Sequence, residues 1–129
     1  MQVWFKRLFA SSIVFVLGVA LTVWATWEPD RQLGNLVARW APAPSAFIEL
    51  DGMQVHVRDT GPRDDPAPIV LLHGMASSLH SFEGWQQALS TDRRVITVDL
   101  PGFGLTGPSP QGEYRIEAYT RFTVRLLDA

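Results

Sequence analysis

The fold of this chain is decided by one stretch, Ile69-Val70-Leu71-Leu72-His73-Gly74-Met75. Its first four residues are apolar and stand between Pro68 and Gly74, and such an uninterrupted run is typical of a strand buried on both faces of a parallel sheet. A glycine directly after a strand allows a sharp turn that exposes backbone N–H groups. Because ligands of open α/β sheets bind at the carboxyl ends of the strands, the stretch predicts a buried strand that ends in a ligand-binding turn.

A second stretch of the same kind lies at residues 94–104. Residues 94–98 (RVITV) have the composition of another buried strand, and residues 99–104 (DLPGFG) follow it as a glycine-rich turn. Between the two stretches, residues 79–89 carry apolar side chains at helical spacing. A strand–helix–strand unit makes two parallel strands of one sheet. We therefore expect both turns to open on the same edge of that sheet.

This pair of motifs, in this order, resembles the first part of the α/β-hydrolase fold, and the resemblance covers residues 46–129. The resemblance implies an oxyanion-hole donor in the N–H of the residue after His-Gly. It also implies a nucleophile on a later strand-to-helix turn, carried by a strand that would flank residues 69–72. Without that strand, we expect an unpaired apolar edge. The site residues that the resemblance implies are the oxyanion-hole residues Gly74 and Met75, the supporting His73, and a second site loop with Asp99, Gly102 and Gly104.

The group that would attack a substrate is not found in the sequence. No Gly-x-Ser-x-Gly occurs, and the nearest segment, residues 107–111 (GPSPQ), lacks the second glycine. Ser77, Ser78 and Ser81 are better explained as turn or cap residues. In the family the catalytic histidine lies near the C-terminal end of a much longer chain. We therefore expect no catalytic residue in this chain, and we expect it to be a truncated or fragmentary product without hydrolase activity.

Other elements are predicted from local patterns. Asp51-Gly52 between two strand-like runs predicts a β-hairpin. In its second strand we expect a buried face with Met53, Val55 and Val57, and a solvent-facing side with Gln54, His56 and Arg58. The helix at residues 79–89 is expected to bury Leu79, Phe82, Trp85 and Leu89, with Ser81 as its N-cap. A last helix within residues 113–129 is expected to bury Ile116, Tyr119, Thr123 and Leu126.

A possible membrane segment lies near the N-terminus. Residues 8–27 contain no charged side chain, and a helix of that length spans about 30 Å, the thickness of the hydrocarbon core of a bilayer. Lys6 and Arg7 precede the segment, and Glu28 and Asp30 follow it. The positive-inside rule therefore places the N-terminus in the cytoplasm and the rest outside, in the periplasm or the extracellular space.

We therefore predict three regions. These are a cytoplasmic stub with a transmembrane signal-anchor at 1–27, a membrane-proximal linker at 28–45, and the N-terminal part of an α/β-hydrolase domain at 46–129. In this reading residues 8–27 contact membrane lipid. The alternative is a cleaved signal peptide that ends near Val23-Trp24-Ala25, and it places the downstream region on the same side of the membrane.

Composition excludes several other classes of function. The formal net charge of −2 gives no basis for nucleic-acid binding, and the absence of cysteine excludes disulfides and thiolate metal sites. The three histidines lack the spacing of metal ligands, so we expect no metal and no cofactor. We predict a membrane-anchored α/β-hydrolase-like protein whose full form hydrolyses small-molecule carboxylic esters through a Ser-His-Asp triad. The alternative is a non-catalytic, membrane-tethered interaction module completed by a partner chain. Epoxide hydrolase, dehalogenase, acyltransferase and haloperoxidase-like activities also remain open.

Overall fold

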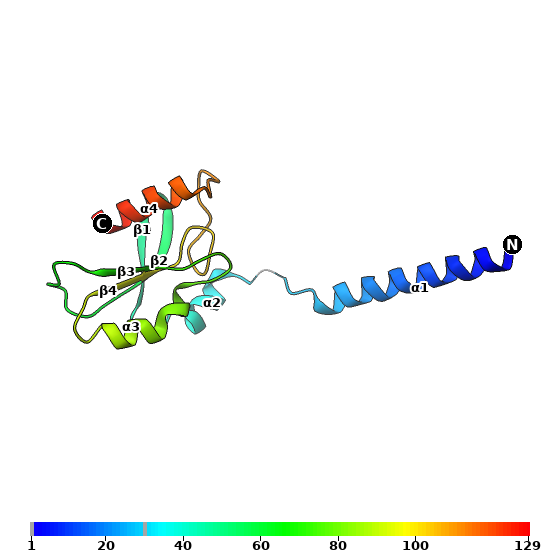
Figure 1. Ribbon diagram of the computed structural model, residues 1–129, viewed down its shortest axis with the longest axis horizontal. Coiled ribbons are helices and arrows are strands. Elements are labelled where there is room, and N and C mark those ends of the chain that lie inside the picture. Colours follow the sequence, from blue (N-terminus) through cyan, green and yellow to red (C-terminus); the bar gives the residue numbers. More distant parts are fainter. Residues whose placement is uncertain (1, 30) are drawn as a thin grey trace. The chain divides into compact units, whose positions relative to one another are not determined.

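The computed structural model describes residues 2–29 and 31–129, so Asp30, used above to orient the membrane segment, lies outside the described residues. The chain forms two compact units, one up to Arg31 and one from Gln32 to Ala129. The first unit is one long helix, α1 (Gln2–Thr26), drawn in blue in Figure 1.

From Phe9 onward, helix α1 has no charged side chain. Its segment Phe9–Thr26 has a mean hydropathy of 2.0 and is long enough to cross a membrane, a property that signal sequences share. The hydroxyls of Thr22 and Thr26 donate to the carbonyl oxygens of Gly18 (2.9 Å) and Thr22 (2.8 Å). Because these polar groups bond within the helix itself, they add little polarity to its outer surface.

The second unit is built on a four-stranded mixed sheet with the strand order β1-β2-β4-β3. Its elements are α2 (Leu33–Trp40), β1 (Ser45–Leu50), β2 (Met53–Thr60), β3 (Ile69–Leu72), the 3₁₀ helix η1 (Leu79–Phe82), α3 (Glu83–Leu89), β4 (Val95–Val98) and α4 (Ile116–Asp128).

The strand pairing confirms the two main topological predictions. Strands β1 and β2 form an antiparallel hairpin through Asp51 (φ 53°) and Gly52 (φ 80°), the left-handed pair that a tight hairpin turn requires. Strands β3 and β4 are parallel, with Ile69 opposite Val95 and Leu72 opposite Val98. The turns that follow β3 and β4 therefore open on the same edge of the sheet. Within the described residues, the other edge of β3 has no strand beside it.

Helices cover the two faces of the sheet. Helix α4 lies over one face and α3 lies under the other, as Figure 1 shows. The face under α4 holds the apolar core, which consists of Leu50, Met53, Val55, Val57, Val98, Phe122 and Leu126. On the face toward η1 and α3, fully buried Leu79 and Val95 pack beside polar side chains of β2.

The prediction of a solvent-facing side of β2 was right for Gln54, which is exposed, and wrong for the other two residues. His56 is fully buried (0% exposed), and Arg58 is only 6% exposed. The reason is that η1 and α3 cover this face and supply polar partners there. Arg58 forms an ion pair with Glu83 at the start of α3 (2.9 Å). An alternating polar pattern therefore marked a covered polar layer rather than a surface in contact with water.

The apolar stripes predicted for the helices were wrong in part. Trp85 is 64% exposed, and Gln86 is buried in its place. In α4, Leu126 is buried as expected, but Phe122 takes the second core position and Ile116 is 73% exposed. Ser81 lies inside η1, where its hydroxyl donates to the carbonyl oxygen of Ser78 (2.8 Å), so it is not the cap of α3.

The loop before β3 is held by Asp65, and this predicts an acid-sensitive stability. The backbone N–H of Ala67, the Arg93 guanidinium and the backbone N–H of Arg94 lower the pKa of the Asp65 carboxyl from 3.8 to about 2. Between these values the unfolded chain binds more protons than the folded one, so this contribution is complete above pH 3.8 and is lost as the pH falls toward 2. We expect Asp65→Asn to flatten the fall in unfolding free energy over this range, measured by urea denaturation.

The exposed neighbour Asp64 provides the matched control. Asp64→Asn makes the same change of charge without removing these contacts, so the acid dependence should stay as in the parent chain. An equal flattening in both variants would show that overall charge, and not the Asp65 contacts, sets the acid dependence.

Candidate functional site

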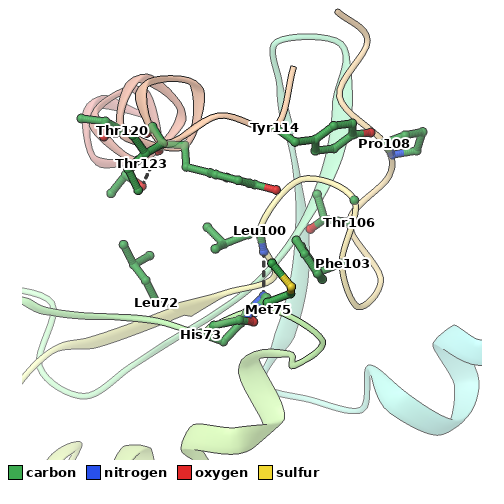
Figure 2. A pocket seen from close by; sticks show the side chains of 14 residues that line it. Leu72, His73, Met75, Leu100, Phe103, Thr106, Pro108, Tyr114, Thr120 and Thr123 are labelled. Carbon is green, nitrogen blue, oxygen red and sulfur yellow. Dashed lines mark hydrogen bonds between the residues drawn. The ribbon is translucent and has the colours of Figure 1, made fainter. Parts of the chain in front are cut away.

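The turns that follow β3 and β4 meet at a cavity of about 730 Å³ (Figure 2). Four of the six predicted site residues line it, namely His73, Gly74, Met75 and Gly102. Leu72, Leu100, Phe103, Thr106, Pro108, Tyr114, Ile116, Tyr119, Thr120 and Thr123 complete the lining. The cavity is mostly apolar, with backbone groups of the two turns at one side, which is the usual composition of a small-molecule site.

His73 joins the two turns. Its Nδ1 lies 2.8 Å from the carbonyl oxygen of Gly74, and its Nε2 accepts the backbone N–H of Leu100 at 3.0 Å. With the proton on Nδ1, both ring nitrogens are satisfied, and the ring is 5% exposed. Phe103 packs edge-on against it, with ring centroids 5.5 Å apart. His73 thus fixes the turn after β3 to the turn after β4.

Met75 is the most accessible part of this arrangement. The residue is 89% exposed, and among the described residues its backbone N–H has no acceptor. The sequence suggested that Gly74 makes the sharp turn. In the structure the left-handed backbone conformation belongs to Ala76 (φ 56°), and Gly74 has no positive φ. An unoccupied backbone N–H beside an apolar cavity is a group that can donate to a substrate oxygen.

The second site loop is held by its own backbone. The N–H groups of Gly102 and Thr106 donate to the carbonyl oxygens of Gly107 (3.0 Å) and Phe103 (3.1 Å). Gly102 has φ 81°, and a Cβ atom there would approach the Tyr114 ring to 2.8 Å. A glycine is therefore needed at this position both for the backbone conformation and for the approach of Tyr114.

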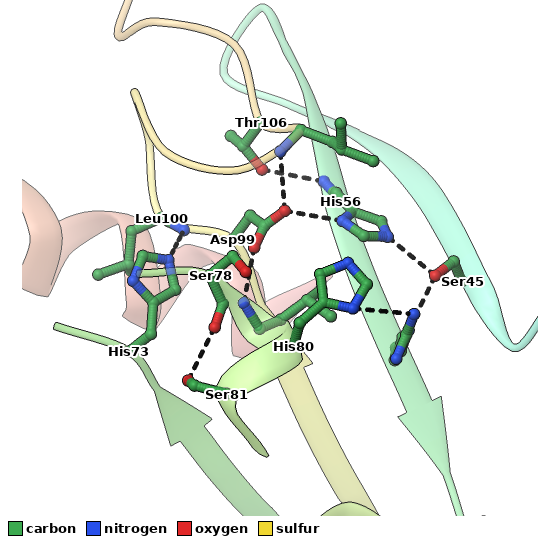
Figure 3. A network of polar contacts seen from close by, with 12 residues as sticks. Ser45, His56, His73, Ser78, His80, Ser81, Asp99, Leu100 and Thr106 are labelled. Atoms are coloured by element: carbon green, nitrogen blue, oxygen red, sulfur yellow. Dashed lines mark hydrogen bonds and ion pairs between the residues drawn. The ribbon is translucent and has the colours of Figure 1, made fainter. Parts of the chain in front are cut away.

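Asp99 and Gly104 are not among the residues that line the cavity. Asp99 is fully buried and accepts bonds from the backbone N–H groups of Leu79 and Leu105 (2.8 Å each) and from His56 Nδ1 (2.7 Å), as Figure 3 shows. Burial acts to raise the pKa of Asp99, but the bonds from His56, Leu105 and Leu79 outweigh it and lower that pKa overall. Asp99 therefore acts as a buried anion that organises the loop.

Helix α4 supplies a wall that the sequence patterns did not predict. Tyr119 was expected in the core, but it lines the cavity, and its hydroxyl reaches the carbonyl oxygen of Pro101 at 3.4 Å. Burial and the neighbouring Tyr114 raise the pKa of the Tyr119 phenol, so it stays neutral. No motif marks Tyr114 or Tyr119, because their role depends on how α4 packs across the sheet. Within the described residues, no cluster of three or more potential metal ligands occurs.

Comparison with known proteins shows the family to which this fold belongs. A family model described as the alpha/beta hydrolase fold matches residues 67–129, which include both site turns. The chain belongs to the α/β-hydrolase fold family. The resemblance predicted from the two glycine-bearing motifs is thereby confirmed.

The relatives of this α/β-hydrolase chain are larger proteins. The magnesium-chelatase 30 kDa subunit of Rhodobacter capsulatus is 41% identical over 61 residues, which cover 47% of this chain and 21% of that protein. The 2-hydroxy-6-oxo-2,4-heptadienoate hydrolase of Pseudomonas putida is 33% identical over 87 residues, which cover 64% of this chain and 30% of that protein. The Cif epoxide hydrolase of Acinetobacter nosocomialis is similar in structure, with a TM-score of 0.62 and 26% identity over 79% of this chain and 37% of that one. The chain thus spans 21% to 31% of the length of the curated relatives it matches.

Proposed function

We propose that this chain supplies the oxyanion-binding loop and part of the substrate cavity of a membrane-anchored α/β-hydrolase whose complete form hydrolyses carboxylic esters through a Ser-His-Asp triad. The observation that carries the proposal is that Met75 and Gly102 meet at one apolar cavity, beside the carboxyl ends of parallel β3 and β4. Relatives named as hydrolases of small organic molecules support a small-molecule substrate.

The chemistry follows from the free N–H of Met75. Ester hydrolysis places negative charge on the carbonyl oxygen in the transition state, and a positioned N–H donor stabilises that charge. Loss of one such donor lowers turnover by about a hundredfold to a thousandfold. The apolar side chains of Leu72, Leu100 and Phe103 would face the acyl part of the substrate. In this arrangement the chain binds and polarises an ester, and the nucleophile that attacks the ester belongs to the complete form of the protein.

We also propose that the 129-residue chain does not itself turn over esters. Nucleophilic catalysis needs a hydroxyl, thiol or carboxylate within reach of a base. Among the described residues, His73 is the only imidazole in the cavity lining, and both of its nitrogens are bonded. The hydroxyls of Thr120 and Thr123 donate to carbonyl oxygens of their own helix (2.9 Å each). No lining hydroxyl is therefore paired with a free base.

Hexanoate, a small apolar carboxylate, is expected to bind at this cavity. Its carboxylate resembles the developing oxyanion and its chain fits the apolar lining. We expect it to shift the amide NMR signals of Met75 and Gly102. Met75→Pro removes the N–H and should weaken hexanoate binding by about tenfold, the effect of one charge-assisted hydrogen bond.

Met75→Leu is the matched control, because it keeps the N–H and a side chain of similar size. Binding to this variant should remain close to that of the parent chain. The same preparations should show no turnover of p-nitrophenyl butyrate above buffer. Shifts confined to residues outside the cavity would contradict the binding role, and turnover that Met75→Pro abolishes would contradict the proposed inactivity.

We propose that α1 is a retained membrane anchor with the N-terminus in the cytoplasm. Its exposed apolar surface, with Trp24 at 77% and Trp27 beyond its end at 72% exposure, supports this, as does Arg7 near its start. We expect the full chain, of 14.4 kDa, to stay in the membrane fraction after alkaline carbonate extraction. A released product shortened by about the length of α1, shown by mass spectrometry, would indicate a cleaved signal peptide instead.

A further inference from the structure

A chain of polar contacts runs through the buried face of β2 (Figure 3). The Nε–H of Arg58 donates to Ser45 Oγ at 2.9 Å, Ser45 Oγ lies 2.9 Å from His56 Nε2, and His56 Nδ1 lies 2.7 Å from Asp99 Oδ2. Arg58 can only donate and an ionised Asp99 can only accept. In the neutral imidazole, Nδ1–H therefore donates to Asp99, and the Ser45 hydroxyl donates to Nε2.

The order serine–histidine–aspartate is that of a catalytic triad, but its surroundings do not suit catalysis. The His56 ring is fully buried, and the Phe47 ring stacks on it with centroids 5.1 Å apart. Its Nε2 is occupied by Ser45. Ser45 Oγ also carries a bond from the Arg58 guanidinium, which holds it in place. A substrate atom has no access to the imidazole, so a role in structure fits these contacts better than proton transfer.

Asp99, at the other end of these polar contacts, binds both site loops. Asp99 Oδ1 accepts the N–H of Leu79, the first residue after the oxyanion-binding turn, at 2.8 Å. Asp99 Oδ2 accepts the N–H of Leu105, in the loop that walls the cavity, at 2.8 Å. The backbone N–H of His56 donates to the Thr106 hydroxyl at 3.0 Å. The orientation of one carboxylate thus fixes the positions of two loops.

The Ser45 end of these polar contacts lies where the segment that precedes the sheet joins β1. Ser45 is the first residue of β1, and the compact unit already begins at Gln32. In α2, Trp40 packs edge-on against His80, with ring centroids 5.6 Å apart. His80 and Arg58 both contact Glu83, at 2.8 and 2.9 Å. The segment from Gln32 to Ser45 therefore packs on the residues that support the site.

We propose that Ser45 is a positioning residue for the site, whose hydroxyl orients His56 and, through it, the Asp99 carboxylate that holds the two site loops. Without that hydroxyl, His56 Nε2 would be a buried acceptor with no donor, and the ring would lose one of the two bonds that fix its rotation. The bond from His56 to Asp99 Oδ2 would then lose its fixed direction, and the bonds that the carboxylate accepts from the N–H groups of Leu79 and Leu105 would weaken. The effect is local because the sheet pairing does not depend on it.

Amide hydrogen exchange of the full chain in detergent micelles, followed by NMR, tests this proposal without any substrate. In Ser45→Ala we expect the amides of Leu79 and Leu105 to exchange about tenfold faster, the change that corresponds to one hydrogen bond of ordinary strength. The amide of Ile69, which donates to the Arg94 carbonyl at 2.8 Å, reports on opening of the sheet and should keep its rate. Ser45→Thr keeps the hydroxyl and should restore the rates of the parent chain.

Ser109→Ala is the matched control, because its hydroxyl donates to Gln111 Oε1 (3.4 Å), away from the contacts of Ser45, His56 and Asp99. It should leave Leu79 and Leu105 unchanged. The proposal is overturned if Ser45→Ala leaves these two amides unchanged, if Ile69 accelerates equally, or if Ser45→Thr behaves like the alanine variant. A covalent adduct of a fluorophosphonate probe on Ser45 would also overturn it, because the serine would then be an accessible nucleophile.

Discussion

Replacing Gly104 with alanine is expected to lower the unfolding free energy by about 3–5 kcal/mol, a large part of the stability of a small domain. Gly104 has φ 54°, and a Cβ atom at this position would overlap the buried carboxylate of Asp99. The left-handed conformation costs a non-glycine residue about 1–2 kcal/mol, and overfilling a packed site adds about 1–3 kcal/mol. The displaced carboxylate would also lose hydrogen bonds. Urea denaturation followed by circular dichroism measures the change.

Gly107→Ala is the matched control for this prediction. Gly107 lies in the same loop, has no positive φ, and has no atom within 4 Å of an added Cβ. Alanine there should change the unfolding free energy by less than about 0.5 kcal/mol. If both variants lose the same stability, the loop is sensitive to any side chain and the contact with Asp99 is not the cause.

Asp99→Ala is expected to destabilise the domain by about 4 kcal/mol or more. The substitution leaves three buried donors without an acceptor, the N–H groups of Leu79 and Leu105 and the Nδ1–H of His56. Each unsatisfied buried group costs about 1–3 kcal/mol. We therefore expect a chain that is largely unfolded at 37 °C, with loss of the cooperative thermal transition.

Two further variants make this prediction specific. Asp92→Ala removes an exposed carboxylate and should leave the transition near that of the parent chain. Asp99→Asn keeps the shape and one acceptor oxygen, so its transition should lie between those of Asp99→Ala and the parent. If Asp99→Asn is as stable as the parent chain, the charge of Asp99 contributes nothing and the shape of the side chain alone supports the loops.

The sequence was sufficient for the parts of the fold that depend on local patterns. Asp51-Gly52 identified the hairpin, and the apolar runs that end in glycine-bearing turns identified the parallel strands β3 and β4. The meeting of Met75 and Gly102 at one cavity followed from that parallel arrangement. These features are predictable because each depends on a short segment or on a rule of strand connection.

The buried polar layer could not be read from local patterns. His56 and Arg58 alternate with apolar residues, as the solvent side of a surface strand would, and their partners lie far along the chain. The pairing of β2 with β4 was the missing information. It places Val57 opposite Val98, so that His56 and Asp99 become neighbours. A histidine and an aspartate at adjacent positions of paired strands would have been a recognisable signal once that register was known.

The misplaced helix stripe has a geometric cause. The segment 79–89 was treated as one α-helix, but its first part, η1, is a 3₁₀ helix with about 3.0 residues per turn in place of 3.6. The change of period within the segment rotates the later residues about the axis. Gln86 therefore faces the sheet, and Trp85 faces outward. A prediction of the buried residues that assumes one helical period for the whole segment misses this change.

The turn that contains Met75 follows β3, a strand that is paired on one side only. Within the described residues, β3 is paired with β4, while the opposite row of its backbone groups makes no ladder. A strand paired on one side resists bending and fraying less than a strand paired on both. An extended polypeptide that paired with this free edge of β3 would thus reduce the mobility of the Met75 N–H. The position of this N–H group would then be set at the outer edge of β3, with no change inside the turn itself.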